Sequence, residues 1–264
     1  MHTRGTFLSL LLFCELLLLL LASLLPHEIL RRLSVALSLL LPLLLLRRAP
    51  EGTKRPALLP RTSSAYLLLL LLPAFILTVL GVSVGWGALA DLMGLPLTGA
   101  VPMDSLPLAL LFDALIPAVC EELFCRGAVY AALRPLGRRV AIPVSALIFA
   151  LMHANPAQIP YALVAGLCLG ALYEASGGLL LPILFHLASN VLSLLLMNGL
   201  PAVPTVLVLA GLTLLGGLTL LALRRRIRLS LPASGDVPPL QALRALASPA
   251  LILWLLLILI LTVL

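Results

Sequence analysis

A pair of adjacent glutamates interrupts one of the longest apolar stretches of the chain. The stretch reads EELFCR at positions 121–126. Glu122 precedes Arg126 by four residues, which is the favourable order for an ion pair on a helix, whereas Glu121 points about 100° away around the helix. The spacing predicts a structural pair between Glu122 and Arg126 and leaves Glu121 for acid–base chemistry. The alternative is a buried ion-pair network that only fixes helix packing.

Two of the four histidines also lie inside or at the edge of apolar stretches. His153 ends the segment FALMH at 149–153, and His186 and Asn190 lie four residues apart in HLASN, so that they share one face of a helix. Ionisable groups in hydrocarbon are costly, which makes these side chains functional candidates. The structural alternatives are a packed or interfacial histidine at 153 and a hydrogen-bonding pair between helices at 186 and 190.

The expected depths of these groups in a membrane allow them to meet. At about 1.5 Å per residue, Glu121 lies roughly 18 Å from the end of its helix near residue 133. His153 lies roughly 20 Å, and His186 roughly 10 Å, from the starts of their helices near residues 140 and 179. All three fall in the inner half or the middle of a bilayer about 30 Å thick. An acid, two imidazoles and an amide in a low-dielectric site form a hydrolytic constellation, in which a glutamate can act as a base.

The composition indicates the environment in which this chemistry takes place. The chain has 264 residues, of which 62% are hydrophobic and 10% are charged, whereas a soluble domain carries about 25% charge. This excludes a soluble enzyme, a disordered segment and a nucleic-acid-binding module. In a leucine-rich chain the net charge of +7 indicates membrane orientation.

The apolar segments predict an all-α transmembrane bundle of about eight spans, with seven to nine allowed by the length. They cover residues 7–25, 29–46, 66–84, 106–133, 140–153, 160–173, 179–197, 203–223 and 249–264. We divide the chain into N-terminal membrane segments (1–60), a core bundle (61–223, with the motifs in 106–197), a basic connector (224–248) and a C-terminal transmembrane helix (249–264). The four cysteines lie in apolar segments, and we interpret them as small buried hydrophobes.

Most of the basic residues predict the orientation of the bundle. Of the 17 basic residues, 13 fall in three clusters, within 47–61, 134–139 and 224–244. The positive-inside rule places all three clusters in the cytoplasm. Only Arg31 and Arg32 conflict with this arrangement. Because the loops are short and leucine dominates, we predict a multipass protein of a prokaryotic inner membrane.

Three other acidic residues of the apolar segments have structural interpretations. We expect Glu15 to be buried packing or to lie near an interface, Asp113 to stand at the start of a helix, and Glu174 to cap a helix end. Asp113 alternatively lines an access path.

The three polar motifs together resemble a known family. E-E-x-x-x-R at 121–126, F-x-x-x-H at 149–153 and H-x-x-x-N at 186–190, in this order on three helices, are similar to the CPBP family of intramembrane proteases. This family includes the Ras-converting CAAX prenyl endopeptidases and bacteriocin-processing and immunity relatives. The resemblance covers about residues 106–197 and extends to Gly127, Gly166, Gly170 and the glycines at 177–178.

The resemblance implies an endopeptidase that cleaves near the membrane-associated C-terminal end of a substrate protein. By this resemblance Glu121 activates the attacking water and His153 orients it. His186 and Asn190 stabilise the oxyanion of the tetrahedral intermediate. The ion pair predicted above holds the first helix in register.

The family resemblance leaves the cofactor open between a metal-free and a zinc mechanism. Glu121, His153 and His186 are a plausible set of zinc ligands. However, the chain has no HExxH pair, and Asn190 suits an oxyanion donor better than a ligand. We therefore favour a glutamic-type mechanism without a cofactor and keep Zn²⁺ as the alternative.

The substrate and two competing functions also stay open. The expected partners are the lipid bilayer and a membrane-anchored protein or peptide, with either a prenylated CAAX tail or a bacterial C-terminal sorting signal; no nucleic acid is expected. One competing function is a proton or ion transporter that uses the same polar groups as a relay. The other is a non-catalytic immunity or partner-binding protein on the same scaffold.

Overall fold

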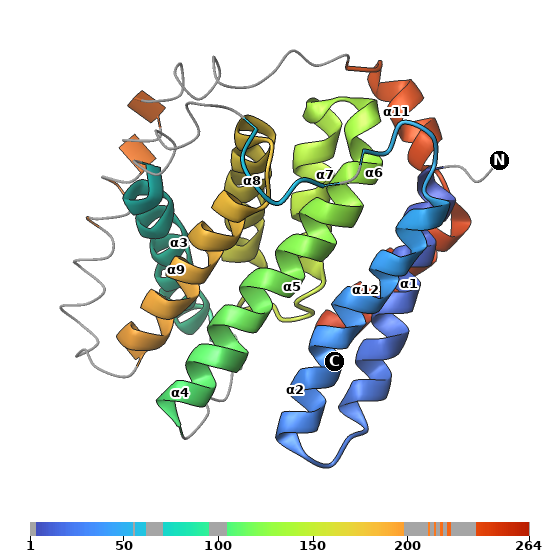
Figure 1. The fold of residues 1–264 in the computed structure, drawn as a ribbon. Coiled ribbons are helices and arrows are strands. Elements are labelled where there is room, and N and C mark those ends of the chain that lie inside the picture. Colours follow the sequence, from blue (N-terminus) through green and yellow to red (C-terminus); the bar gives the residue numbers. More distant parts are fainter. Residues whose placement is uncertain are drawn as a thin grey trace.

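The computed structural model of the chain is built from helices (Figure 1). It describes residues 4–54, 56–61, 71–94, 105–197, 211, 214, 217–218, 221–222 and 236–263. No strand occurs among these residues, and the predicted all-α class is confirmed.

The helices follow the apolar segments closely. Outside the segment 106–136 they are α1 (Arg4–Ser23), α2 (Glu28–Leu40) with its 3-10 extension η1 (Leu41–Arg48), α3 (Leu72–Leu92), α7 (Arg138–Leu151), α8 (Ile159–Ser176), α9 (Leu180–Met197), α11 (Pro239–Leu246) and α12 (Pro249–Val263). The third predicted segment, 66–84, ends too early, because α3 continues for two more turns. Of the predicted segment 203–223, only six residues are among those described.

The glutamate motif lies on one composite helix with two π-helical stretches. Its parts are α4 (Leu106–Ala109), η3 (Leu110–Leu115), α5 (Ile116–Phe124), η4 (Cys125–Tyr130), α6 (Ala131–Leu133) and η5 (Arg134–Leu136). Pro117 stands at the start of α5 and has no N–H to donate to the carbonyl of residue 113, which favours the wider π turn before it. The composite helix ends at Gly137. The φ of this residue is +97°, a conformation that glycine adopts readily.

The described residues contain fewer candidate membrane spans than the roughly eight predicted for the whole chain. Four described helices are long and apolar enough to cross a membrane: α1, α2 with η1, α3 and α8. A fifth results if α11 and α12, bent by 80°, form one broken span. The predicted count of about eight is therefore not confirmed. The composite helix is also long, but it carries five charged residues, Asp113, Glu121, Glu122, Arg126 and Arg134.

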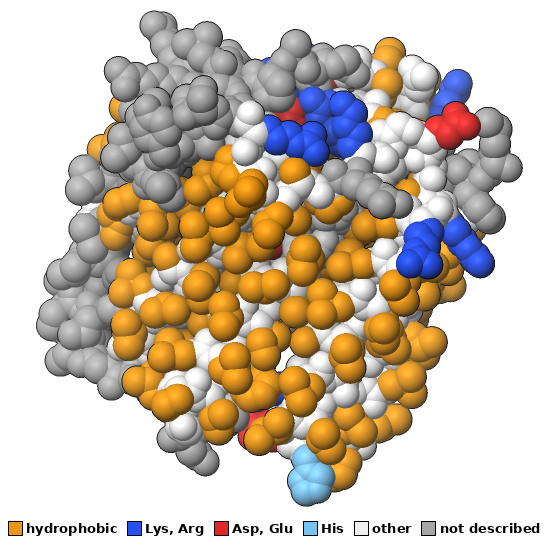
Figure 2. All heavy atoms as spheres, in the orientation of Figure 1, with side chains coloured by type: hydrophobic (Ala, Val, Ile, Leu, Met, Phe, Trp, Pro, Cys, Tyr) orange, Lys and Arg blue, Asp and Glu red, His pale blue; other side chains and the backbone are white. Residues whose placement is uncertain are grey.

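One hydrophobic core joins both ends of the described chain to its centre. Leu8 and Leu11 of α1 and Trp254 of α12 are fully buried in the same cluster as Phe124 of the composite helix. The surface shown in Figure 2 is covered by hydrophobic side chains over its broad middle, while Lys and Arg side chains gather towards one end. This distribution fits a protein surrounded by lipid, and we call the end shown at the top of Figures 1 and 2 the basic end.

A segment crosses the basic end and is bonded to the helices beneath it (Figure 1). We call the described residues 52–54 and 56–61 the strap. The carbonyls of Ala57 and Leu58 accept hydrogen bonds of 2.9 Å from the amides of Leu179 and Leu180, which are among the amides at the start of α9 that have no partner within the helix. At the other side, the Arg61 amide donates to the Ser176 carbonyl at 2.9 Å.

The charge of Arg32, which conflicted with the predicted orientation, is compensated by two acids. Arg32 pairs with Glu28 on its own helix at 2.8 Å and with Asp113 of η3. Asp113 therefore lies two turns inside the composite helix and joins it to α2, so the prediction that it stands at a helix start is wrong. The positive-inside rule counts Lys and Arg and gives little weight to acidic residues, so Arg31 and Arg32 still conflict with the predicted orientation of the first two helices.

Candidate active site

Glu122 and Arg126 form the predicted ion pair in the centre of the bundle. Arg126 Nη1 donates to Glu122 Oε1 at 2.7 Å, and both side chains are excluded from solvent. Arg126 Nη2 also donates to the Gly166 carbonyl of α8 at 3.0 Å, and the guanidinium lies 4.8 Å from the ring centroid of Phe149 on α7. One arginine therefore holds three helices together.

The same glutamate also orients a histidine from a fourth helix. His186 Nδ1 lies 3.0 Å from Glu122 Oε1, and its Nε2 lies 3.8 Å from Glu121 Oε2. Because a carboxylate only accepts hydrogen bonds, the network assigns the Nδ1 proton to the bond with Glu122. His186 Nε2 consequently faces Glu121.

Oε2 of both Glu121 and Glu122 has no hydrogen-bond partner among the described residues, and the two side chains differ at Glu122 Oε1, which accepts from Arg126 and His186. The Glu121 side chain is 21% exposed. Glu122, at 0% exposure, shares its Oε1 between two donors. The two adjacent carboxylates are therefore chemically distinct, one fixed by its partners and the other available.

The ring of Phe149 contacts both imidazoles. His153 lies two residues beyond the end of α7 at Leu151, and its Nδ1 lies 2.8 Å from the Phe149 carbonyl. The imidazoles of His153 and His186 meet the Phe149 ring edge-on, with centroid distances of 5.2 and 5.7 Å. A proton on His153 Nδ1 leaves Nε2 as an acceptor. Asn190 lies one turn beyond His186 on the same helix, half-buried.

Two further side chains lie near Glu121, and the sequence analysis did not assign them to the site. Glu15 of α1 and Tyr161 of α8 are both within the range of electrostatic interaction with the carboxylate of Glu121. Glu15 is 3% exposed, and its Oε2 has no hydrogen-bond partner among the described residues, so the expected burial is confirmed. An ionisable residue in an apolar stretch is the signal that could have placed Glu15 in the site. Tyr161, a tyrosine at a helix start, offers no comparable signal.

The predicted zinc ligands do not converge as a ligand set. Among the described residues no group of three His, Cys, Asp or Glu side chains is arranged to hold a metal ion. Glu122 already engages His186 Nδ1, while His186 Nε2 lies 3.8 Å from Glu121 Oε2. Glu121, His153 and His186 as placed here do not fit a zinc ion, and we derive no step through a metal.

A comparison with known proteins identifies the segment that carries these groups. Residues 103–192 match the family described as type II CAAX prenyl endopeptidase Rce1-like, and all three motifs fall within the match. This segment of the chain is therefore similar to the Rce1-like family. No curated protein and no solved structure matches the chain. The matched segment is about one third of the 264 residues, and together with the apolar helices it indicates an integral membrane protein with the activity of a CAAX-type intramembrane protease.

Proposed function

We propose that this Rce1-like protein is a glutamic-type endopeptidase in which Glu121 activates the attacking water. The observation that carries the proposal is the contrast between the adjacent glutamates. Glu122 is bonded to Arg126 and His186, whereas Glu121 Oε2 lies unbonded at 3.8 Å from the imidazole of His186. A general base needs a carboxylate that is free to accept a proton.

In the proposed reaction the nitrogens of His153, His186 and Asn190 take the roles that the family resemblance implies. Water donates one proton to Glu121 while its oxygen attacks the substrate carbonyl, and His153 Nε2 accepts a hydrogen bond from the second proton to orient the water. The carbonyl oxygen becomes an oxyanion. The Asn190 amide and His186 Nε2, protonated in the imidazolium form, donate to it. Glu122 stabilises that imidazolium through Nδ1. As the C–N bond breaks, Glu121 returns its proton to the leaving nitrogen.

We propose a substrate whose cleavage site lies near a membrane-associated C-terminal end. The name of the family supports a CAAX-type tail, and a bacterial C-terminal sorting signal presents a similar end. The basic end faces the cytoplasm in this proposal, because three clusters of Lys and Arg fall on one side of the predicted spans. The short loops support a prokaryotic inner membrane as the location.

The proposal is tested with the full chain in liposomes and two synthetic peptides, one a farnesylated CAAX tail and the other a sorting signal. Mass spectrometry of the products gives the cleavage rate. Glu121→Gln removes the base and is expected to lower the rate about 10²–10⁴-fold, and Asn190→Ala about 10²–10³-fold. Glu51→Gln, on the exposed surface, is the matched control. Wild-type rates for Glu121→Gln would refute the mechanism.

Metal dependence is tested separately in the same liposomes. Because the described residues do not form a three-ligand site, cleavage is expected to survive 1,10-phenanthroline and EDTA unchanged. Loss of activity that only added zinc restores would show that the metal mechanism is correct.

A further inference from the structure

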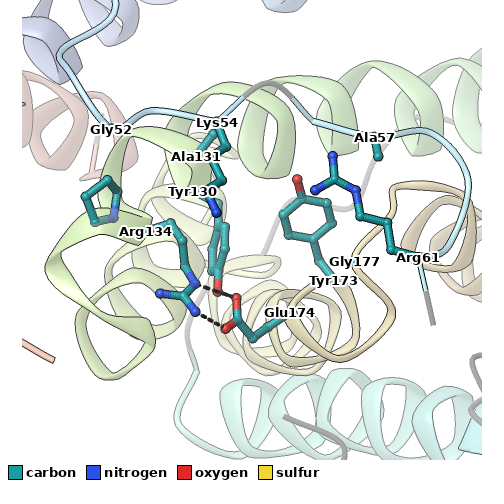
Figure 3. A pocket seen from close by; sticks show the side chains of 11 residues that line it. Gly52, Lys54, Ala57, Arg61, Tyr130, Ala131, Arg134, Tyr173, Glu174 and Gly177 are labelled. Carbon is teal, nitrogen blue, oxygen red and sulfur yellow. Dashed lines mark hydrogen bonds and ion pairs between the residues drawn. The ribbon is translucent and has the colours of Figure 1, made fainter. Parts of the chain in front are cut away.

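A cavity of about 500 Å³ lies at the basic end, away from the glutamate motif. The strap, the end of the composite helix and the end of α8 form its walls (Figure 3). Six of its lining side chains are charged or aromatic: Lys54, Arg61, Tyr130, Arg134, Tyr173 and Glu174. Its volume is typical of sites for small ligands.

One wall of the cavity is a tightly bonded group centred on Glu174. Arg134 donates to both carboxylate oxygens, from Nε at 2.7 Å and from Nη2 at 2.6 Å, and the Tyr130 hydroxyl donates at 2.6 Å. Glu174 therefore binds the composite helix, and the prediction that it caps a helix end is wrong. Burial lowers the pKa of Arg134, but the bonds with Glu174 outweigh burial and raise the pKa above its usual value. Arg134 thus stays charged and fixed in direction.

The strap supplies two positive charges that no described acid neutralises. Lys54 and Arg61 come from the strap, and neither forms an ion pair with an acidic residue in the described part of the chain. Figure 3 shows the Arg61 guanidinium beside the Tyr173 ring. With Arg134 and Glu174, the lining carries three cationic groups and one carboxylate. The cavity is therefore suited to an anion.

The strap is held in place, so these charges are positioned before a ligand arrives. Its backbone bonds to Ser176, Leu179 and Leu180 fix the strap over the ends of α8 and α9. Gly177 and Gly178 allow the strap to approach the backbone between α8 and α9 closely, because they have no side chains. A β-carbon at Gly177 would lie 3.2 Å from Arg61 Cβ, and one at Gly178 would collide with the backbone of Leu59.

Packed core separates the cavity from the proposed catalytic groups. Tyr130 is eight residues beyond Glu122, which is about 12 Å along a helix. Between them Arg126 and the rest of η4 are fully buried. A peptide bound at Glu121 does not reach the cavity through this core, and the anion that fits the cavity is a ligand other than the scissile segment.

We propose that the cavity is a binding site for a phosphate group, supplied either by the headgroup of an anionic lipid or by a soluble phosphate compound. Arginine forks and a lysine are the side chains that bind phosphate best. A basic pocket at the ends of membrane helices lies at the level of lipid headgroups. The proposal does not depend on proteolysis, since no proposed catalytic residue lines the cavity.

The experiment measures thermal unfolding of the full chain in nanodiscs of phosphatidylcholine. One arm replaces increasing fractions of this lipid by phosphatidylglycerol, and the other adds inorganic phosphate at constant ionic strength. The pocket variant is Lys54→Gln/Arg61→Gln. The control is Arg47→Gln/Arg48→Gln, which removes the same charge from exposed residues outside the cavity. An unchanged melting temperature in pure phosphatidylcholine shows that a variant is folded.

We expect phosphatidylglycerol to raise the melting temperature of the wild type and of the control. The pocket variant should need at least about tenfold more of it for the same rise, since one charge-assisted hydrogen bond is worth about this factor. A rise with inorganic phosphate alone, lost in the pocket variant, would support a soluble ligand. If both double variants lost this stabilisation to the same extent, the proposal would be overturned, because the stabilisation would then depend on the general surface charge. Stabilisation only by a peptide with a free C-terminal carboxylate would also overturn it.

Discussion

The two adjacent glutamates should respond in opposite ways to the same substitution. Glu122→Gln removes the negative charge that faces Arg126 at 2.7 Å and His186 at 3.0 Å, and leaves a fully buried guanidinium without its counter-charge. Glu121→Gln changes a side chain whose Oε2 has no hydrogen-bond partner among the described residues. The first change is therefore expected to damage the fold and the second only the chemistry.

The size of the effect follows from the burial of the pair. Breaking a buried ion pair by removing one partner costs about 3–5 kcal/mol, which for a chain of this length corresponds to a fall of about 6–20 °C in melting temperature. For Glu121→Gln we expect a change of less than about 1 kcal/mol, as for a substitution that breaks no buried hydrogen bond. Part of the stability lost in Glu122→Gln should be regained in Glu122→Gln/Arg126→Met, because both charges of the buried pair are then gone.

The assay is thermal unfolding in detergent, followed by tryptophan fluorescence. Trp254 is a suitable reporter because it is fully buried in the core that also contains the composite helix. Equal melting temperatures for Glu121→Gln and Glu122→Gln would refute the distinction between the two carboxylates. A double variant less stable than Glu122→Gln would show that Arg126 contributes chiefly through Gly166 and Phe149, and not through its charge pair.

Further predictions concern glycines of α8 and α3 and a hydrogen bond between the composite helix and α8. Gly166→Ala would place a β-carbon 2.9 Å from Ala146 Cα, so we expect a loss of about 1–3 kcal/mol from overpacking. At Gly85 of α3, where no described atom lies within 4 Å of a β-carbon, alanine should stabilise the helix by up to about 1 kcal/mol. Equal effects of the two alanines on melting would contradict this. Tyr130→Phe removes one donor to Glu174 and should cost about 1 kcal/mol, measured in the same way, and an unchanged melting temperature would show that this bond contributes nothing.

The parts of the site that were predictable from the sequence are those set by local spacing. Glu122 and Arg126 are four residues apart on one helix, so their pairing needs no knowledge of the fold. The bond between Glu122 and His186 joins residues 64 positions apart, and its existence depends on how α9 packs against the composite helix. A sequence pattern gives the face of each helix but not the rotation of one helix against another.

The same limit explains the errors made at Asp113 and Glu174. Both were interpreted through their own helices, because helix ends are where isolated acids most often have a local role. In the structure each acid binds an arginine from another helix, Arg32 in one case and Arg134 in the other. The span count is not confirmed for a different reason: apolar length predicts how many helices can cross a membrane only where charged groups and breaks do not interrupt them.

Two polar contacts hold the composite helix and α8 in register, and both join residues that are the same number of positions apart in the sequence. Arg126 bonds to the carbonyl of Gly166, and Arg134 bonds to Glu174, both forty positions along the chain. The helices therefore run parallel over these eight residues. Apolar side chains of similar size tolerate exchange with one another, so leucine-rich faces alone specify register weakly. A shift of one residue would break both arginine contacts at once, and we infer that these two arginines fix the alignment on which the positions of Glu121 and Glu122 depend.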